Sequence, residues 1–209
     1  SSDLVLASDP TMLRARLSLA TLLLQEDHAD QAQELLEATP QGLSKAAHDS
    51  FQVQLLYYQT LKARGWTLEA ERALDVAVQL APTGCAVLEA LVDLRRDAGD
   101  VRGAIAAAGR LRGCNPYSDR LADELYDSGQ RTEAQAEYER LLRLEPENEE
   151  WTAALARLLQ SRRGAGDRER ALSLRSELLA RNPRNISSRI ELANLQVELC
   201  KRADAKATL

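Results

Sequence analysis

One spacing recurs four times in this chain of 209 residues and constrains its fold more than any other feature. A Gly is followed five residues later by an Ala, and a Pro stands twelve residues after that Ala. The copies are Gly65/Ala70/Pro82, Gly99/Ala104/Pro116, Gly129/Ala134/Pro146 and Gly166/Ala171/Pro183. Because the chain has only ten Gly and six Pro, four matches at fixed offsets indicate an internal repeat.

Each position of this frame has a physical role in a pair of packed helices. Gly tolerates the positive φ at which a first helix stops and the chain turns. The Ala lies early in a second helix, where a small side chain lets the first helix approach closely. Pro cannot continue a helix, so it marks the exit toward the next pair. Leu and Ala dominate the composition, whereas Val and Ile together number eleven, so an all-α chain is expected.

The same face of each second helix should be apolar four and seven residues after the repeat Ala. The chain has these pairs of residues there: Leu74/Ala77, Ala108/Leu111, Tyr138/Leu141 and Arg175/Leu178. Toward the ends the frame weakens, with Asp27 before Ala32 and Cys200 before Ala205 in the place of the Gly. The arginine at position 175 is the exception to the apolar pattern.

The stretch LADELYDSGQRTEAQAEYERLLRLEPEN, from Leu121 to Asn148, resembles the tetratricopeptide repeat (TPR) family, with Tyr138 in the family's aromatic position. No copy has the family's Trp. The resemblance covers residues 13–209, after a lead-in at 1–12, and implies a right-handed α-solenoid of antiparallel helix pairs. The approximate repeats are 13–50, 51–84, 85–114, 115–148, 149–185 and an incomplete 186–209.

The spacing between repeats is uneven. Ala104 and Ala134 are only 30 residues apart, which predicts a short first helix before Gly129. The chain ends four residues after Ala205, before a second helix of the usual length would finish. An unfinished repeat would expose an apolar face, so we expect this chain to be a piece of a longer protein.

No motif for catalysis or for a cofactor is present. The sequence has no G-x-x-x-x-G-K phosphate loop and no G-x-S-x-G elbow. His28 and His48 each stand alone, without a second His or Cys at metal-ligand spacing. Cys85, Cys114 and Cys200 form no C-x-x-C pair, so we interpret them as three reduced thiols in a reducing compartment. We therefore expect a protein that is not an enzyme and needs no cofactor or metal.

The charge pattern favours a protein partner over nucleic acid. The net charge of −5 gives no basic footprint. Residues 119–150 hold eleven acids against four basic residues, whereas residues 162–189 hold eight basic residues against three acids. In the TPR family, the first helices line a concave surface that binds ligands. By this resemblance the expected partner-binding residues are Gln59, Glu89, Asp93, Asp97, Asp119, Asp123, Asp127, Arg157 and Asn194.

The spacing of six of these residues indicates two acidic stripes. Glu89, Asp93 and Asp97 are four residues apart, as are Asp119, Asp123 and Asp127, so each trio lies on one side of a helix. Like charges gathered in this way favour a basic or hydroxyl-rich partner. The concave face of TPR proteins that grip acidic chaperone C-termini carries Lys, Asn and Arg instead, so that clamp is not expected here.

These observations predict a non-catalytic scaffold that binds a protein or peptide, which can be basic, in the concave groove. Two alternatives keep the same fold. One is a periplasmic scaffold for bacterial exopolysaccharide synthesis or export, with polysaccharide as a possible partner. The other is the helical arm of a larger enzyme such as a glycosyltransferase. No stretch approaches the ~20 apolar residues of a membrane helix, so we expect no membrane insertion of this segment, and a cytoplasmic location with the periplasm as the alternative.

Overall fold

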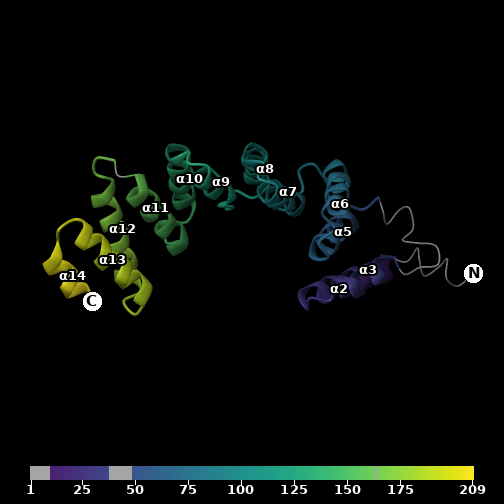
Figure 1. Cartoon of the computed structure of the whole chain (residues 1–209), viewed down its shortest axis with the longest axis horizontal. Helices are drawn as coiled ribbons and strands as arrows, with labels where there is room; N and C mark the ends of the chain where they lie inside the picture. The colour runs from purple at the N-terminus through teal and green to yellow at the C-terminus, as the bar shows by residue number, and fades with distance from the viewer. Residues whose placement is uncertain (1–9, 38–48, 163) are drawn as a thin grey trace, which may run out of the picture. The chain divides into compact units, whose positions relative to one another are not determined.

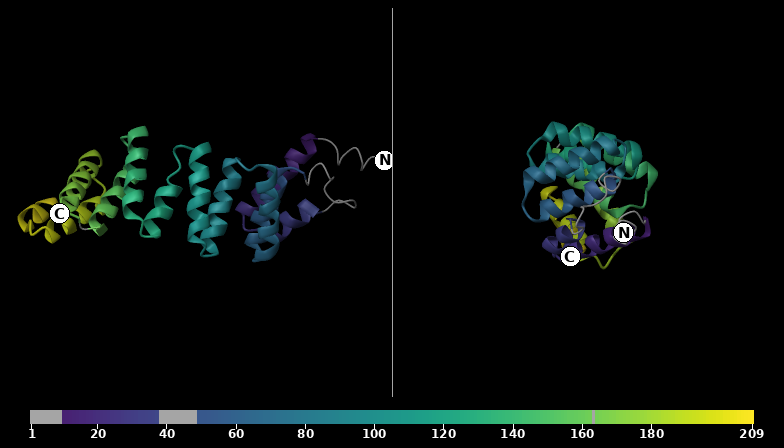
Figure 2. Two further views of the ribbon diagram at one scale, coloured as in Figure 1. Left: turned by 90° about the horizontal axis from the view of Figure 1, so that it is seen from above. Right: turned by 90° about the vertical axis from the view of Figure 1, so that its right-hand side faces the viewer.

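The computed structural model describes residues 10–37, 49–162 and 164–209, and every regular element within these ranges is an α-helix. The chain divides into two compact units, Ser1–Cys114 and Asn115–Leu209. In each unit, consecutive helices run antiparallel and pack as pairs (Figures 1 and 2). The predicted all-α class is confirmed.

Unit 1 contains three helix pairs among its described residues. Their bounds are α2 Pro10–Gln25 with α3 Ala29–Glu37, α5 Phe51–Ala63 with α6 Thr67–Leu80, and α7 Cys85–Asp97 with α8 Val101–Cys114. The first helix of the second pair, α5, packs against the first helices on either side of it, α2 and α7. A core cluster of Ala20, Ala32, Leu36, Val53 and Leu56 joins the first pair to the second.

Unit 2 repeats the arrangement with three further pairs. Their bounds are α9 Arg120–Asp127 with α10 Arg131–Leu144, α11 Glu149–Arg162 with α12 Asp167–Arg181, and α13 Ile186–Glu198 with α14 Arg202–Thr208. The first helix α9 has only eight residues, as the 30-residue spacing between Ala104 and Ala134 predicts. Successive pairs meet where α10 packs on α11 and α12 packs on α13.

The turn inside each pair uses the residue that the frame predicts. Gly65, Gly99, Gly129 and Gly166 all have φ between 71° and 81°, the left-handed region where a side chain would be strained. Asp27 and Cys200, which replace Gly in the outer copies, have φ of 63° and 60°. The frame therefore marks the same backbone turn in all six pairs.

The repeat alanines are buried, as expected. Ala32, Ala104, Ala134 and Ala171 have no exposed surface, and Ala70 and Ala205 have at most 4%. Seven residues further along the second helix, Ala77, Leu111, Leu141 and Leu178 are buried as well. These side chains form the apolar seam between the two helices of a pair, so the spacing in the sequence locates the core.

Two asparagines fix where first helices begin in unit 2. The Oδ1 atom of Asn148 accepts a hydrogen bond from the backbone N–H of Trp151 at 3.1 Å, and Asn185 accepts one from Ser188 at 3.0 Å. Both satisfy an N–H that the first turn of a helix leaves without a partner. Each Asn follows a repeat Pro by two residues, so the same short segment specifies where one helix pair ends and where the next begins.

Candidate functional site

The predicted partner-binding residues all belong to the first helices of pairs or directly precede one. In unit 1, Gln59 lies on α5, and Glu89, Asp93 and Asp97 lie on α7. In unit 2, Asp119 is the N-cap of α9, and Asp123, Asp127, Arg157 and Asn194 lie on α9, α11 and α13. We use the name candidate face for these nine residues, which form a separate set in each unit. Its two acidic trios belong to different units.

In unit 1, two of the three carboxylates are neutralised by neighbouring cations. The Nζ atom of Lys62 lies 2.7 Å from Asp97 and 5.8 Å from the ring centre of Tyr58. The hydrogen bond from Lys62 lowers the pKa of Asp97. Asp93 is paired with Arg96 at 2.6 Å. Since both residues are engaged, Glu89 is the carboxylate of this trio that stays available on the exposed surface.

In unit 2, two carboxylates accept hydrogen bonds from aromatic side chains. The indole N–H of Trp151 donates to Asp119 at 3.2 Å, and the hydroxyl of Tyr138 donates to Asp123. Burial raises the pKa of Asp123, the hydrogen bond from Tyr138 lowers it, and repulsion from Asp119 and Asp127 raises it further. Burial and the bond to Asp123 also raise the pKa of Tyr138. These contacts hold α9 against α10 and α11.

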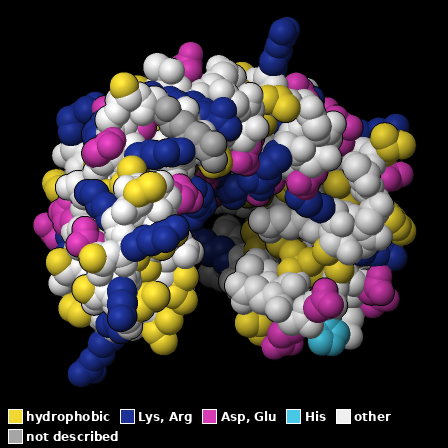
Figure 3. Space-filling model, turned by 60° about the vertical axis from the view of Figure 1, so that its left-hand side comes forward, with side chains coloured by type: hydrophobic (Ala, Val, Ile, Leu, Met, Phe, Trp, Pro, Cys, Tyr) yellow, Lys and Arg dark blue, Asp and Glu magenta, His cyan; other side chains and the backbone are white. Residues whose placement is uncertain are grey.

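Five residues of the candidate face are exposed and make no hydrogen bond or ion pair with the residues that the structure describes. They are Gln59, Glu89, Asp127, Arg157 and Asn194. Two are acidic, one is basic and two are amides, so they can contact both polar and charged groups of a partner. On the face of the molecule drawn in Figure 3, charged and hydrophobic side chains are intermixed.

A groove in unit 1 adjoins the candidate face at Gln59, and the sequence interpretation did not include its wall on α2. It has a volume of about 760 Å³ and lies between α2 and α5, with Ala86 of α7 at its edge. Gln59 lines it together with apolar residues that include Leu17 and Leu55. The signal was present in the spacing, because Leu17 and Leu55 stand ten residues before Asp27 and Gly65, respectively.

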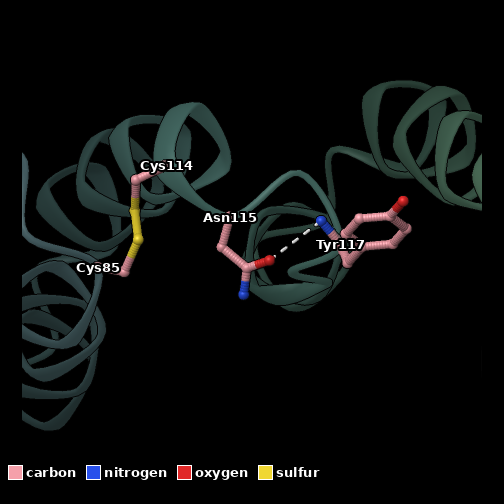
Figure 4. The surroundings of a disulfide bond; sticks show 4 residues. All are labelled: Cys85, Cys114, Asn115 and Tyr117. Atoms are coloured by element: carbon pink, nitrogen blue, oxygen red, sulfur yellow. Dashed lines mark hydrogen bonds between the residues drawn. A yellow bond between two sulfur atoms is a disulfide. The ribbon is translucent and has the colours of Figure 1, made fainter.

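The interpretation of three reduced thiols is wrong for two of the cysteines. Cys85 and Cys114 form a disulfide with their Cα atoms 5.8 Å apart, and Cys200 is free and exposed. Cys85 is the first residue of α7 and Cys114 the last residue of α8 (Figure 4). Since the two helices are antiparallel, these ends are adjacent, and the repeat frame could have paired the cysteines.

Neither a candidate metal site nor a membrane-spanning helix occurs in the part of the chain that the structure describes. Within the described ranges, no group of three or more His, Cys, Asp or Glu side chains could hold a metal ion. His28 is exposed in the turn between α2 and α3, and His48 lies outside the described residues. Among the described helices, none is both long and apolar enough to cross a membrane.

Comparison with known proteins finds similar folds among solved structures. No family model and no curated protein sequence matches this chain. Solved structures do match it: a tetratricopeptide repeat protein from Parabacteroides merdae has a TM-score of 0.72 at 15% identity, covering 94% of this chain and 77% of its own.

Two further solved structures give similar values. PilF from Pseudomonas aeruginosa has a TM-score of 0.71 at 16% identity over 94% of this chain and 88% of its own. PilW, a type IV pilus biogenesis factor, has a TM-score of 0.71 at 14% identity over 96% of this chain and 91% of its own. At these identities the likeness concerns the fold, and it agrees with the fold expected from the repeat frame.

Proposed function

We propose that this chain of packed helix pairs, whose fold is similar to that of tetratricopeptide repeat proteins, is a non-catalytic scaffold that binds another protein or peptide through the candidate face. The observation that carries this proposal is the set of five exposed residues on first helices that no described residue engages. Stacked repeats suit such a role, since within each unit every helix pair adds exposed side chains to a binding surface.

The partner that fits the acidic residues carries basic side chains. Glu89 and Asp127 are exposed carboxylates without a described partner, so each can accept a hydrogen-bonded Lys or Arg at little desolvation cost. In contrast, Asp97 and Asp123 already accept hydrogen bonds from side chains of this chain. We therefore assign contact with the partner to Glu89 and Asp127, and a positioning role to Asp97 and Asp123.

A charge-reversal experiment tests this assignment. Wild-type chain is immobilised, and proteins captured from the source cells are quantified by mass spectrometry beside a Glu89→Lys/Asp127→Lys variant. The matched control is Asp75→Lys/Glu133→Lys, which makes the same change of charge at exposed residues of the second helices α6 and α10. We expect the control to retain the wild-type partners and the candidate-face variant to lose them at least tenfold. Equal capture by all three chains would refute the proposal.

The disulfide favours the periplasm, the alternative location, over the cytoplasm. Disulfides persist in oxidising compartments and are rare where thiols are kept reduced, so we infer that Cys85 and Cys114 form their bond outside the cytoplasm. This supports the periplasmic alternative, including a scaffold for exopolysaccharide synthesis or export. The arm of a larger enzyme remains compatible with the same surface.

Thiol counting in cells tests the compartment. The tagged chain is captured under denaturing conditions and labelled with a maleimide carrying polyethylene glycol, with and without prior reduction. An oxidising compartment predicts one labelled thiol, Cys200, before reduction and three afterwards. Three labelled thiols without reduction would place the chain in a reducing compartment.

A further inference from the structure

The groove between α2 and α5 has apolar walls from both helices. Leu13 and Leu17 of α2 face the same space as Phe51 and Leu55 of α5. All four side chains are half-buried, so they contribute to packing and still present a surface to a ligand. Its volume of about 760 Å³ lies within the range of sites that bury several side chains of a ligand.

Folding of the repeat does not require these positions to be apolar. Leu17 and Leu55 stand ten residues before the turn residue of their pair. The same place holds Glu89 in α7 and Asp119 before α9, and these pairs adopt the same turn. Leu17 packs in part against the core cluster of the first two pairs, but both leucines keep exposed surface, and the carboxylates at the equivalent positions show that this exposed part need not be apolar for the repeat to fold.

The groove carries one charge, and it is positive. Arg14 is exposed at its edge, and no described residue forms an ion pair with it. The other polar groups are neutral, among them the side-chain amides of Gln52 and Gln59. Gln52 accepts a hydrogen bond from Ser50 at 2.9 Å, which leaves its NH₂ group free to donate to a carbonyl of a bound chain.

We propose that this groove binds a short apolar segment of a partner protein that carries a carboxylate, with its leucine-like side chains between Leu17 and Leu55 and the carboxylate at Arg14. The charge complementarity with Arg14 selects this occupant over a basic one. The inference rests on the proposed scaffold function and adds to it, because the groove takes an acidic apolar segment while Glu89 and Asp127 take basic groups.

A pair of matched peptides tests the groove. Both are fluorescein-labelled helical peptides with leucines at positions i, i+3, i+4 and i+7. One carries two aspartates on the polar face, and the other carries two lysines in their place. Binding is measured by fluorescence anisotropy to the whole chain. An exposed ion pair contributes up to about 1 kcal/mol, so we expect wild type to bind the aspartate peptide three- to fivefold more tightly than the lysine peptide.

Variants separate the apolar from the charged contribution. Arg14→Glu is expected to reverse the preference and favour the lysine peptide. Leu17→Asn/Leu55→Asn is expected to weaken both peptides at least tenfold, whereas Leu68→Asn, at an exposed leucine of α6, should change neither. Circular dichroism checks that each variant keeps its helices, and a variant that unfolds is replaced by Leu17→Ser alone.

The outcomes are decisive in both directions. Absence of binding, equal binding of the two peptides, or binding that survives the leucine substitutions would overturn the groove proposal. If only the groove proposal fails, wild type still captures more partner protein than Glu89→Lys/Asp127→Lys. If the scaffold function fails, the two chains capture equal amounts, so the two failures are distinguishable.

Discussion

Arg175 illustrates how a single residue adapts the repeat. It occupies the place where Tyr138 stands in the preceding pair, and its side chain is buried with 6% exposure. Its guanidinium donates to Oε1 of Gln160 at 2.7 and 2.8 Å and pairs with Glu191 of the next first helix. A buried cation is tolerated because its donors are satisfied across three helices.

Replacing this arginine separates packing from pairing. Arg175→Ala removes both and leaves Gln160 and Glu191 without their donor, so we expect a loss of about 2 kcal/mol in the free energy of unfolding. Arg175→Met keeps an apolar side chain where the repeat expects one, and should lose less than half as much. Urea unfolding followed by circular dichroism measures both. A Met variant as unstable as the Ala variant would contradict this account.

Asp167 carries the pH dependence of the turn before α12. It is 5% exposed, receives two hydrogen bonds from Arg162 at 2.6 and 2.7 Å, and accepts the N–H of Gly164 at 2.7 Å. The bonds from Arg162 are the main cause of its lowered pKa, and the Gly164 N–H adds to it. The ionised form is therefore the one that the folded turn stabilises.

The direction of this shift gives the sign of the pH effect. A carboxyl with a lowered folded-state pKa contributes stability above its unfolded value of about 3.9, and this contribution is lost as the pH falls through the folded-state pKa. We expect Asp167→Asn to lower the melting temperature at pH 7 and to reduce the loss of stability between pH 5 and pH 2. Parallel pH curves for both chains, measured by calorimetry, would show that Asp167 contributes nothing.

The turn glycines give a test with an internal control. At Gly129, φ is 81° and an added Cβ would meet nothing within 4 Å, so Gly129→Ala costs only backbone strain, about 1–2 kcal/mol. Gly109 lies inside α8, where an added Cβ also meets nothing within 4 Å. Gly109→Ala should therefore stabilise by about 0.5–1 kcal/mol. Thermal melts of the two variants should shift in opposite directions, and shifts in the same direction would contradict the assigned turn.

At the scale of elements, an arginine of the second helix holds the proline that precedes its own pair. Arg110 of α8 donates to the carbonyl of Pro82 at 2.6 Å, and Arg140 of α10 donates to that of Pro116 at 2.8 Å. Arg181 of α12 reaches the carbonyl of Pro146 at 3.5 Å. Each contact satisfies a carbonyl in the link between pairs, so the link is fixed without adding residues to it.

The disulfide closes the open end of one helix pair. Cys85 and Cys114 are 29 residues apart in sequence, and a cross-link over such a loop stabilises by about 2–4 kcal/mol. We expect Cys85→Ser/Cys114→Ser to lower the urea midpoint accordingly, with Cys200→Ser as the matched control that leaves it unchanged. An equal midpoint for the double variant and wild type would show that the bond adds no stability.

Patterns within one pair of helices were predictable from sequence, whereas contacts between pairs were not. The Gly and Ala positions predicted the turns and the buried seam because each has a local role. The pairings of Lys62 with Asp97 and of Trp151 with Asp119 join residues 35 and 32 apart, and they depend on how one pair rotates against the next. The stripes of three carboxylates therefore predicted a charged surface. They could not predict which of these carboxylates bind other side chains of the chain.

At the scale of the whole molecule, each repeat combines buried positions with exposed ones. Both helices of a pair contribute to the core, since Leu88 and Leu159 of first helices are as deeply buried as Leu74 and Leu141 of second helices. Substitutions at such buried positions change stability. The exposed residues of the first helices form the candidate face and part of the groove, and they can vary without disturbing the turns. The same fold can therefore carry an apolar groove at α2 and α5 and acidic residues at α7 and α9.

Hydrogen–deuterium exchange of the chain with and without its captured partner tests the central claim most directly, that binding uses the first helices. We predict slower exchange on binding in α5, α7, α9 and α11, with α6, α8, α10 and α12 unchanged. Slower exchange confined to the second helices, with the first helices unchanged, would contradict it.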